Sequence, residues 1–177
     1  MQQIVFLRGV NVGSHNRIAM PALRGLLSAK GFGEVRTYVQ SGNVMLSSDL
    51  SPDELARQCG RLVADGFGLE VAVVVRTRDE LAEVVERNPL GDVAVDPKRY
   101  QVSFLSEELG EDRLRELAEL AVEPERLVAV GRELYAWHPA GVARSRLWAR
   151  LAGRGLGVTA TARNWTTVTK LLAMADE

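Results

Sequence analysis

A repeated order of secondary-structure elements constrains the fold of this chain more than any other feature. Short apolar runs, which predict strands, alternate with amphipathic stretches, which predict helices. The order strand, helix, strand, strand, helix, strand occurs twice, and a last helix follows each copy. This is the order of the split βαβ, or ferredoxin-like, motif. We therefore expect an α+β fold in which two duplicated ferredoxin-like (βαββαβ) halves pack into one compact body.

The first half is expected at residues 1–89, before a connector at residues 90–97 that contains glycine, proline and aspartate. Its strands are predicted over residues 4–7, 35–39, 44–47 and 71–75. Met20 and Pro21 predict the start of one helix, and capping boxes at residues 51–54 and 77–80 predict the starts of two more. Asn88 and Pro89 then end the third helix.

The second half is expected at residues 98–177 and follows the same order with different residues. Strands are predicted over residues 100–105, 126–130, 133–137 and 157–159, and helices over residues 112–121, 142–152 and 162–174. We find no strong residue-level repeat, so the duplication that we predict is one of element order.

Composition excludes several classes of protein. The formal net charge is −1, so no overall field selects nucleic acid or a membrane surface. No apolar run reaches the roughly 18 residues of a membrane span, and the first residues lack the pattern of a signal peptide. Cys59 is the single cysteine and is predicted to be buried without a thiol partner, while His15 and His138 lie far apart. We expect a cytoplasmic protein without a metal, a cofactor or a membrane partner.

Charge is nevertheless segregated along the chain. Residues 1–33 contain four basic residues and no acid, and residues 134–175 contain six basic residues and no acid. Residues 107–125 carry eight acids against two arginines. We expect the two basic segments to converge, which would place the loop at residues 8–17 beside Arg163, because an anionic ligand would offset their mutual repulsion.

The loop at residues 8–17 is the most suggestive candidate for a binding site. It follows a buried strand and precedes a helix, where glycine-flanked backbone N–H groups can form an anion-binding nest. Arg8 and Arg17 supply charge, and Asn11 and Gly13 supply an amide and a flexible backbone. The segment matches neither the P-loop nor the dinucleotide fingerprint. The alternative is an ordinary long loop whose glycines and asparagines satisfy turn geometry.

Two further segments contribute candidate ligand-binding residues. Gln40, Ser41 and Asn43 would present two amides and a hydroxyl, although a plain hairpin turn explains the same residues. Arg163 and Asn164 would favour an anion at the predicted start of the last helix. There the alternative is a helix start capped by a threonine, with the polar residues exposed.

Three segments together carry a family resemblance: residues 6–13 (FLRGVNVG), 35–44 (VRTYVQSGNV) and 161–168 (TARNWTTV). With the pattern around them they resemble the bacterial family of uncharacterised proteins known as domain of unknown function 1697, over essentially the whole chain. The family usually has a second glycine and a lysine where this chain has Ser14 and His15. The resemblance implies a duplicated α/β fold in a small cytosolic bacterial protein, and it implies no reaction.

We therefore expect the protein to bind a small anionic ligand, a nucleotide or a phosphorylated metabolite, at the first loop and the last helix. An enzyme acting on such a ligand is the alternative, with Tyr38, Ser41 or His15 as acid–base groups. Single-stranded nucleic acid is a third, weaker hypothesis. It uses possible aromatic stacking positions and an arginine stripe, namely Tyr100, Phe104, Tyr135, Trp137, Arg146, Arg150 and Arg154. The sequence leaves the oligomeric state and any catalytic residues open.

Overall fold

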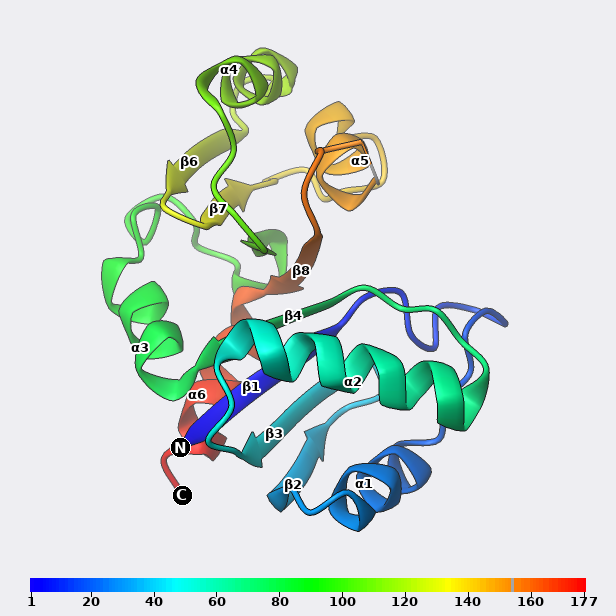
Figure 1. The fold of residues 1–177 in the computed structure, drawn as a ribbon. Coiled ribbons are helices and arrows are strands. Elements are labelled where there is room, and N and C mark those ends of the chain that lie inside the picture. The colour runs from blue at the N-terminus through cyan, green and yellow to red at the C-terminus, as the bar shows by residue number, and fades with distance from the viewer. Residues whose placement is uncertain (154) are drawn as a thin grey trace. The chain divides into compact units, whose positions relative to one another are not determined.

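The structure is a computed structural model, and it describes residues 1–153 and 155–177. The chain divides into two compact units, which we call unit 1 (Met1–Ala82 with Leu171–Glu177) and unit 2 (Glu83–Lys170). Within the described residues, each unit holds one four-stranded antiparallel sheet (Figure 1). The unit boundaries fall inside helices α3 (Arg78–Arg87) and α6 (Trp165–Ala175), so each of these helices contributes residues to both units.

Hydrogen bonds and ion pairs at the two helices agree with this division. The hydroxyl of Tyr135 donates to the carbonyl of Val84 at 2.9 Å, which ties the end of α3 to the sheet of unit 2. Arg78, at the start of α3, pairs with Asp176, just beyond α6, at 2.7 Å within unit 1. The sequence halves at residues 1–89 and 98–177 stay our proposed repeats, and the compact units differ from them at these two helices.

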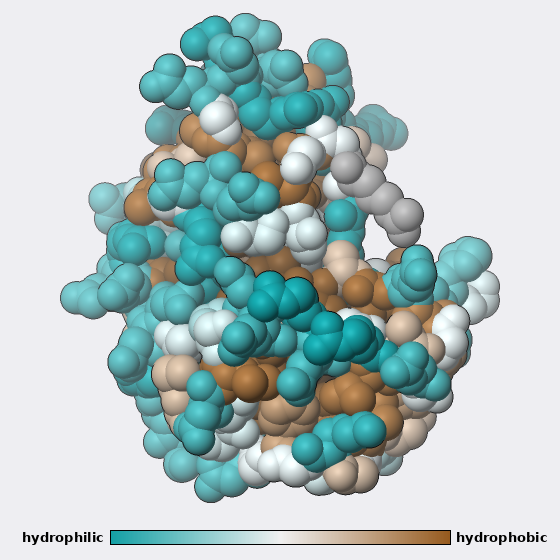
Figure 2. Space-filling view, in the orientation of Figure 1, coloured by the Kyte–Doolittle hydropathy of each residue, from teal (hydrophilic) through white to brown (hydrophobic). Residues whose placement is uncertain are grey.

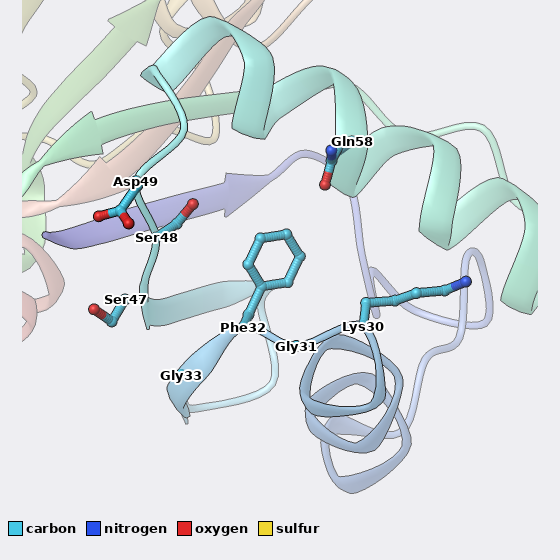
Figure 3. A pocket seen from close by; sticks show the side chains of 8 residues that line it. All are labelled: Lys30, Gly31, Phe32, Gly33, Ser47, Ser48, Asp49 and Gln58. Atoms are coloured by element: carbon cyan, nitrogen blue, oxygen red, sulfur yellow. The ribbon is translucent and has the colours of Figure 1, made fainter.

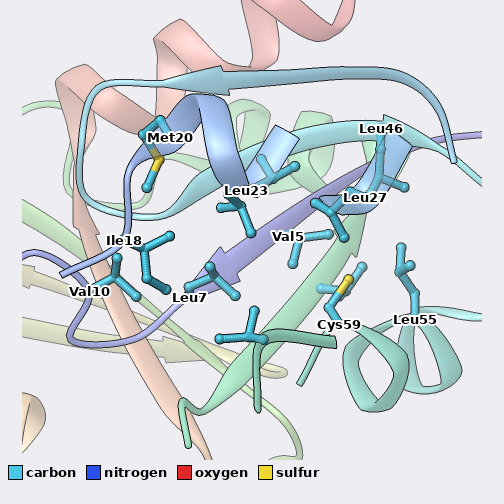
Figure 4. Close-up of a cluster of buried hydrophobic side chains, with 13 residues drawn as sticks. Val5, Leu7, Val10, Ile18, Met20, Leu23, Leu27, Leu46, Leu55 and Cys59 are labelled. Atoms are coloured by element: carbon cyan, nitrogen blue, oxygen red, sulfur yellow. The ribbon is translucent and has the colours of Figure 1, made fainter. Parts of the chain in front are cut away.

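Unit 1 has the ferredoxin-like strand order β2-β3-β1-β4. Its elements are β1 (Gln2–Leu7), α1 (Met20–Ala29), β2 (Gly33–Tyr38), β3 (Asn43–Ser47), α2 (Pro52–Phe67) and β4 (Val73–Thr77). Val5 and Leu7 of β1 join α1 and α2 in a buried core (Figure 4). Cys59 lies in this core at 1% exposure, which confirms its predicted burial, and the burial raises the pKa of its thiol to about 12.

Unit 2 repeats the arrangement with strand order β6-β7-β5-β8. Its elements are a 3₁₀ turn (Pro97–Arg99), β5 (Tyr100–Leu105), α4 (Glu111–Leu120), β6 (Arg126–Val130), β7 (Glu133–Trp137), α5 (Arg146–Ala152) and β8 (Ala160–Asn164). A second core lies between this sheet and the helices α4 and α5, and Leu105, Leu117 and Leu147 belong to it. The predicted duplicated α+β fold is confirmed.

The helix starts of unit 1 follow from their capping residues. Ser51 accepts a hydrogen bond from the backbone N–H of Glu54, and the Glu54 side chain accepts one from the Ser51 N–H, so the predicted capping box is present. The hydroxyl of Thr77 accepts from the N–H of Glu80 at 3.1 Å and caps α3. Figure 2 shows hydrophilic side chains along the outward side of α2, opposite its buried face.

The pairing of the strands aligns β1 with β5 at individual residues, which adds a local match to the duplicated element order. Ile4 pairs with Arg76 and Met45, and the matching Val102 pairs with Arg163 and Tyr135. In this register Gln3, Phe6 and Leu7 of β1 correspond to identical residues in β5, namely Gln101, Phe104 and Leu105. The repeat was missed because three identities in one strand are too few to stand out without the pairing.

The end of unit 2 differs from the sequence expectations. Helix α5 begins at Arg146, not at residue 142, because Gly141 has a φ of 85° and the Ser145 hydroxyl caps the helix by accepting from the N–H of Trp148 at 3.0 Å. The last strand covers Ala160–Asn164, not residues 157–159, and α6 begins at Trp165, not at residue 162. Pairing with β5 extends the strand to Asn164 and delays the helix.

Candidate functional site

The loop between β1 and α1 in unit 1, residues 8–19, has an unusual backbone. Gly9, Asn11, Gly13 and Asn16 all have positive φ, at 69°, 56°, 58° and 49°. Glycine and asparagine tolerate this region better than other residues, so the loop is built from residue types that fit its conformation. The backbone N–H of Asn11 donates to the carbonyl of Asn16 at 3.0 Å, which closes the loop on itself.

Asn11 fixes this loop to the turn between β2 and β3, residues 39–42. Its Nδ2 donates to the carbonyls of Ile18 and Gln40 at 2.9 and 2.6 Å, and its Oδ1 accepts from the N–H of Ile18 at 2.9 Å. A side-chain amide has two N–H donors, and both are used here. Asn11 therefore positions the loop, and its Nδ2 does not act as the ligand contact that the sequence suggested.

The turn at residues 39–42 is tightly held. Buried Asn43 donates from Nδ2 to the Tyr38 carbonyl at 3.3 Å and to the Ser41 hydroxyl at 3.0 Å. Gly42 has a φ of 84°, and a Cβ there would lie 2.8 Å from the Cβ of Leu7. Asn43, like Asn11, thus holds the backbone of the site in place rather than forming its surface.

Other predicted residues of unit 1 lie on the surface of this loop and turn. Arg17, Gly13, Gln40 and Ser41 are exposed, and Arg8 is half-buried. The structure therefore brings the loop at residues 8–19 and the turn at residues 39–42 together as one site, which we call the loop–turn site. A guanidinium, a backbone segment, an amide and a hydroxyl are the groups that it offers to a ligand.

Arg163 and Asn164 lie at the end of β8 in unit 2, and each has a role in the fold there. Arg163 is 9% exposed, not exposed at a helix start as expected, and donates to the hydroxyl of Thr161 at 2.7 Å and to the carbonyl of Ala162 at 2.8 Å. Burial lowers the pKa of the Arg163 guanidinium to about 10. Asn164, rather than Thr161, caps α6, because its Oδ1 accepts from the N–H of Thr167 at 2.9 Å.

The matching positions of unit 1 support this structural explanation. Arg76 occupies the register of Arg163, is 1% exposed, and donates to the carbonyl before it, as Arg163 does. Thr77 likewise occupies the position of Asn164 and caps the next helix. These features recur in both units and have partners within the fold, so we leave Arg163 and Asn164 out of the site. The expected convergence of the two basic segments concerns both units and stays a prediction.

The aromatic side chains of unit 2 do not form an open stacking surface. Tyr100, Phe104, Tyr135 and Trp137 are between 0% and 7% exposed, and Tyr100 stacks on Trp165 with 4.8 Å between ring centroids. Stacking of bases needs exposed rings, so these residues offer no support for nucleic-acid binding. Arg150 of the predicted arginine stripe contacts Glu116 at 3.5 Å, and Arg154 lies outside the described residues.

Unit 2 contains a polar cluster that the sequence did not reveal. Glu125 Oε2 accepts hydrogen bonds from Ser145 Oγ and from Nδ1 of the buried His138, the latter at 2.7 Å. His138 therefore has an acidic partner, which lies 13 residues away in the sequence. Burial alone would raise the pKa of Glu125, but the hydrogen bonds from Ser145 and His138 lower it on balance.

The geometry of this cluster is that of a structural clamp. In a catalytic triad the histidine accepts the serine proton, whereas here Ser145 donates to the carboxylate, and its Oγ lies 3.3 Å from the same Nδ1 of His138 that contacts Glu125. Within the described part of the chain, Nε2 of His138 is buried without a hydrogen-bond partner. The cluster joins the segment before β6, the end of β7 and the N-terminus of α5.

A shallow pocket of about 320 Å³ lies elsewhere in unit 1, between the end of α1, the end of β3 and α2. It is lined by Lys30, Gly31, Phe32, Gly33, Ser47, Ser48, Asp49 and Gln58 (Figure 3). The charged groups of Lys30 and Asp49 extend in different directions in Figure 3 and do not converge on one point. The pocket therefore offers no defined set of contacts to a ligand.

The described residues contain neither a candidate metal centre nor a candidate membrane-spanning helix. Across residues 1–153 and 155–177, no three His, Cys, Asp or Glu side chains lie close enough together to hold a metal ion. None of the helices in these ranges combines the length and the hydrophobicity that a membrane crossing requires.

The fold and the site define a class of protein: a duplicated ferredoxin-like α+β protein with a longer first loop in one unit. The chain belongs to the family described as "Protein of unknown function (DUF1697)", whose model matches residues 1–135. The match confirms the family resemblance and covers the segments at residues 6–13 and 35–44, while the segment at residues 161–168 lies beyond the matched residues. A similar solved structure is that of the conserved bacterial protein SP0830 from Streptococcus pneumoniae, which is 22% identical, with a TM-score of 0.77 over 98% of both chains. Comparison with curated proteins gives no match.

Proposed function

We propose that the loop–turn site of unit 1 binds a small anionic ligand, a nucleotide or a phosphorylated metabolite. The observation that supports this proposal is the difference between the two units at matching positions. Residues 8–19 join the first strand to the first helix in unit 1, whereas only residues 106–110 do so in unit 2. Unit 2 forms the same fold with the shorter connection, so the common fold does not require a loop of this length, although Val10 and Ile18 of the loop pack into the core of unit 1. Long loops inside compact domains are often functional.

The hairpin β2–β3 of unit 1 and the hairpin β6–β7 of unit 2 differ in the same way. Residues 39–42 form the turn between β2 and β3, and residues 131–132 form the matching turn between β6 and β7. The two longer segments of unit 1 contact each other through the hydrogen bond from Asn11 to Gln40. The additions to the common fold therefore occur together, as expected if they serve one site.

The charges of the two connections favour an anion in unit 1. Arg8 and Arg17 flank the long loop, and no acid occurs in residues 1–33. The short connection of unit 2 instead carries Glu107 and Glu108. Guanidinium groups form paired hydrogen bonds with phosphate and carboxylate oxygens, so exposed Arg17 is the principal contact that we propose.

Titration with inorganic phosphate, followed by chemical shifts of backbone amides, tests this function. Saturable shifts are expected in residues 8–19 and 39–42. A hydrogen bond to a charged group contributes about 1.5–3 kcal/mol, so Arg17→Ala should weaken binding at least tenfold. The matched control is Arg57→Ala, which removes an exposed arginine from α2 of the same unit. The proposal fails if the wild-type protein shows no saturable shifts, or if both variants weaken binding equally.

A further inference from the structure

Two exposed valines lie on the loop–turn site. Among the described residues of unit 1, the exposed large apolar side chains are Met1, which is the first residue, Val12 at 61% and Val39 at 52%. Val12 follows Asn11, and Val39 precedes Gln40, so each valine adjoins one partner of the hydrogen bond that joins the loop to the turn. Both belong to the segments by which unit 1 exceeds unit 2.

A valine is unexpected at position 39 because of the backbone conformation there. Its φ is 52°, in the left-handed region that β-branched residues avoid because the side chain crowds the backbone. The other positive-φ residues of the loop–turn site are glycine or asparagine: Gly9, Asn11, Gly13, Asn16 and Gly42. Glycine or asparagine would fit position 39 better, and a half-exposed valine gains little from packing. A residue that neither conformation nor packing favours is a candidate for function.

We propose that Val12 and Val39 contact a non-polar, planar part of the ligand, so that the ligand is a phosphate ester of such a group, typified by a nucleoside monophosphate. This inference rests on the proposed function, because Arg17 holds the phosphate. The base lies against the two valine side chains, which lose their contact with water when it binds. Gln40 and Ser41, both exposed beside Val39, supply amide and hydroxyl groups to the sugar or the base edge.

Three probes separate the parts of this ligand: inorganic phosphate, ribose 5-phosphate and adenosine 5′-monophosphate. We expect the nucleotide to bind at least tenfold more tightly than ribose 5-phosphate, because only the nucleotide carries a base. Val39→Thr and Val12→Thr replace a methyl group with a hydroxyl and keep the β-branched shape. Each should reduce the preference for the nucleotide at least threefold and leave the affinity for inorganic phosphate unchanged. Val122→Thr, at an exposed valine of unit 2, is the control.

The outcomes distinguish this inference from the function on which it rests. If all three probes bind equally and the valine variants change nothing, the contact with a planar group is wrong while anion binding stands. If none of the probes binds, the proposed function fails, and this inference fails with it. Equal loss of phosphate and nucleotide affinity in Val39→Thr would show that Val39 maintains the loop and does not select the ligand.

Discussion

In the loop–turn site, the residue that fixes the backbone, Asn11, differs from the residue that carries the exposed charge, Arg17. Asn11 is uncharged and uses its side chain for three hydrogen bonds to backbone atoms, two of them within the loop and one to the turn. Arg17, in contrast, is exposed and contributes charge. Substitutions at these two positions should therefore affect different properties of the protein.

Replacement of Asn11 should lower stability as well as binding. Asn11→Gly keeps a residue that tolerates the φ of 56° and removes the side-chain hydrogen bonds, so it should cost about 1–3 kcal/mol of unfolding free energy. Asn11→Ala should cost about 1 kcal/mol more, because alanine is also strained at positive φ. Urea unfolding measures both values. Equal stability of Asn11→Gly and wild type would show that the clamp contributes nothing.

At the scale of single elements, helix starts and strand runs could be predicted where a local signal specifies them. The capping box at Ser51 and the stop at Pro89 depend on neighbouring residues, and both are present in the structure. The start of α6 was misplaced because pairing of β8 with β5, a contact distant in sequence, decides where that strand ends. The same limit hid the Glu125–His138 contact, whose partners lie on different elements.

The candidate site was partly predictable for the same reason. Its loop was recognisable from glycines, asparagines and arginines that lie next to one another in sequence. Its join to the β2–β3 turn depends on the hydrogen bond from Asn11 to Gln40, which local pattern cannot reveal. The unusual φ of Val39 was equally hidden, because a valine fits the strand that the sequence predicts over residues 35–39.

The Glu125 cluster should make the stability of unit 2 depend on pH. The pKa of Glu125 is lower in the folded protein than its ordinary value of 4.5. Between those two values the unfolded state binds more protons, so stability rises with pH. The contribution of Glu125 to the free energy of unfolding is therefore complete above its ordinary pKa. It is lost as the pH falls through the pKa that Glu125 has in the folded protein.

Glu125→Gln tests this dependence, because glutamine keeps the shape of the side chain and does not titrate. Unfolding free energies measured between pH 3 and 7 should show a large deficit in the variant at pH 7 that shrinks toward pH 3. Glu123→Gln, at an exposed position two residues earlier, should show no such deficit. A deficit independent of pH would mean that the charge of Glu125 is not what stabilises the cluster.

At the scale of the whole chain, the last residues belong to a unit formed mainly by the first. Residues 171–177 are part of unit 1, and Leu171 is fully buried. Deletion of these residues should therefore destabilise the sheet made by β1 to β4, which faster amide hydrogen exchange in those strands would report. Deletion of residues 176–177 alone removes the exposed pairs of Arg78 with Asp176 and Arg36 with Glu177 and should have little effect. Equal exchange rates in both deletions would contradict the assignment of Leu171 to unit 1.

The buried arginines at matching registers have a consequence for the history of the chain. Arg76 and Arg163, together with the glutamine, phenylalanine and leucine shared by β1 and β5, are the residues expected to survive from a common ancestor of the two halves. A duplicated gene carries two copies of every folding requirement, so selection on a connection in one copy can relax without loss of the fold. The long basic loop of the first half and the short acidic loop of the second occupy the same place in this arrangement, so each can carry a different chemistry on the same fold.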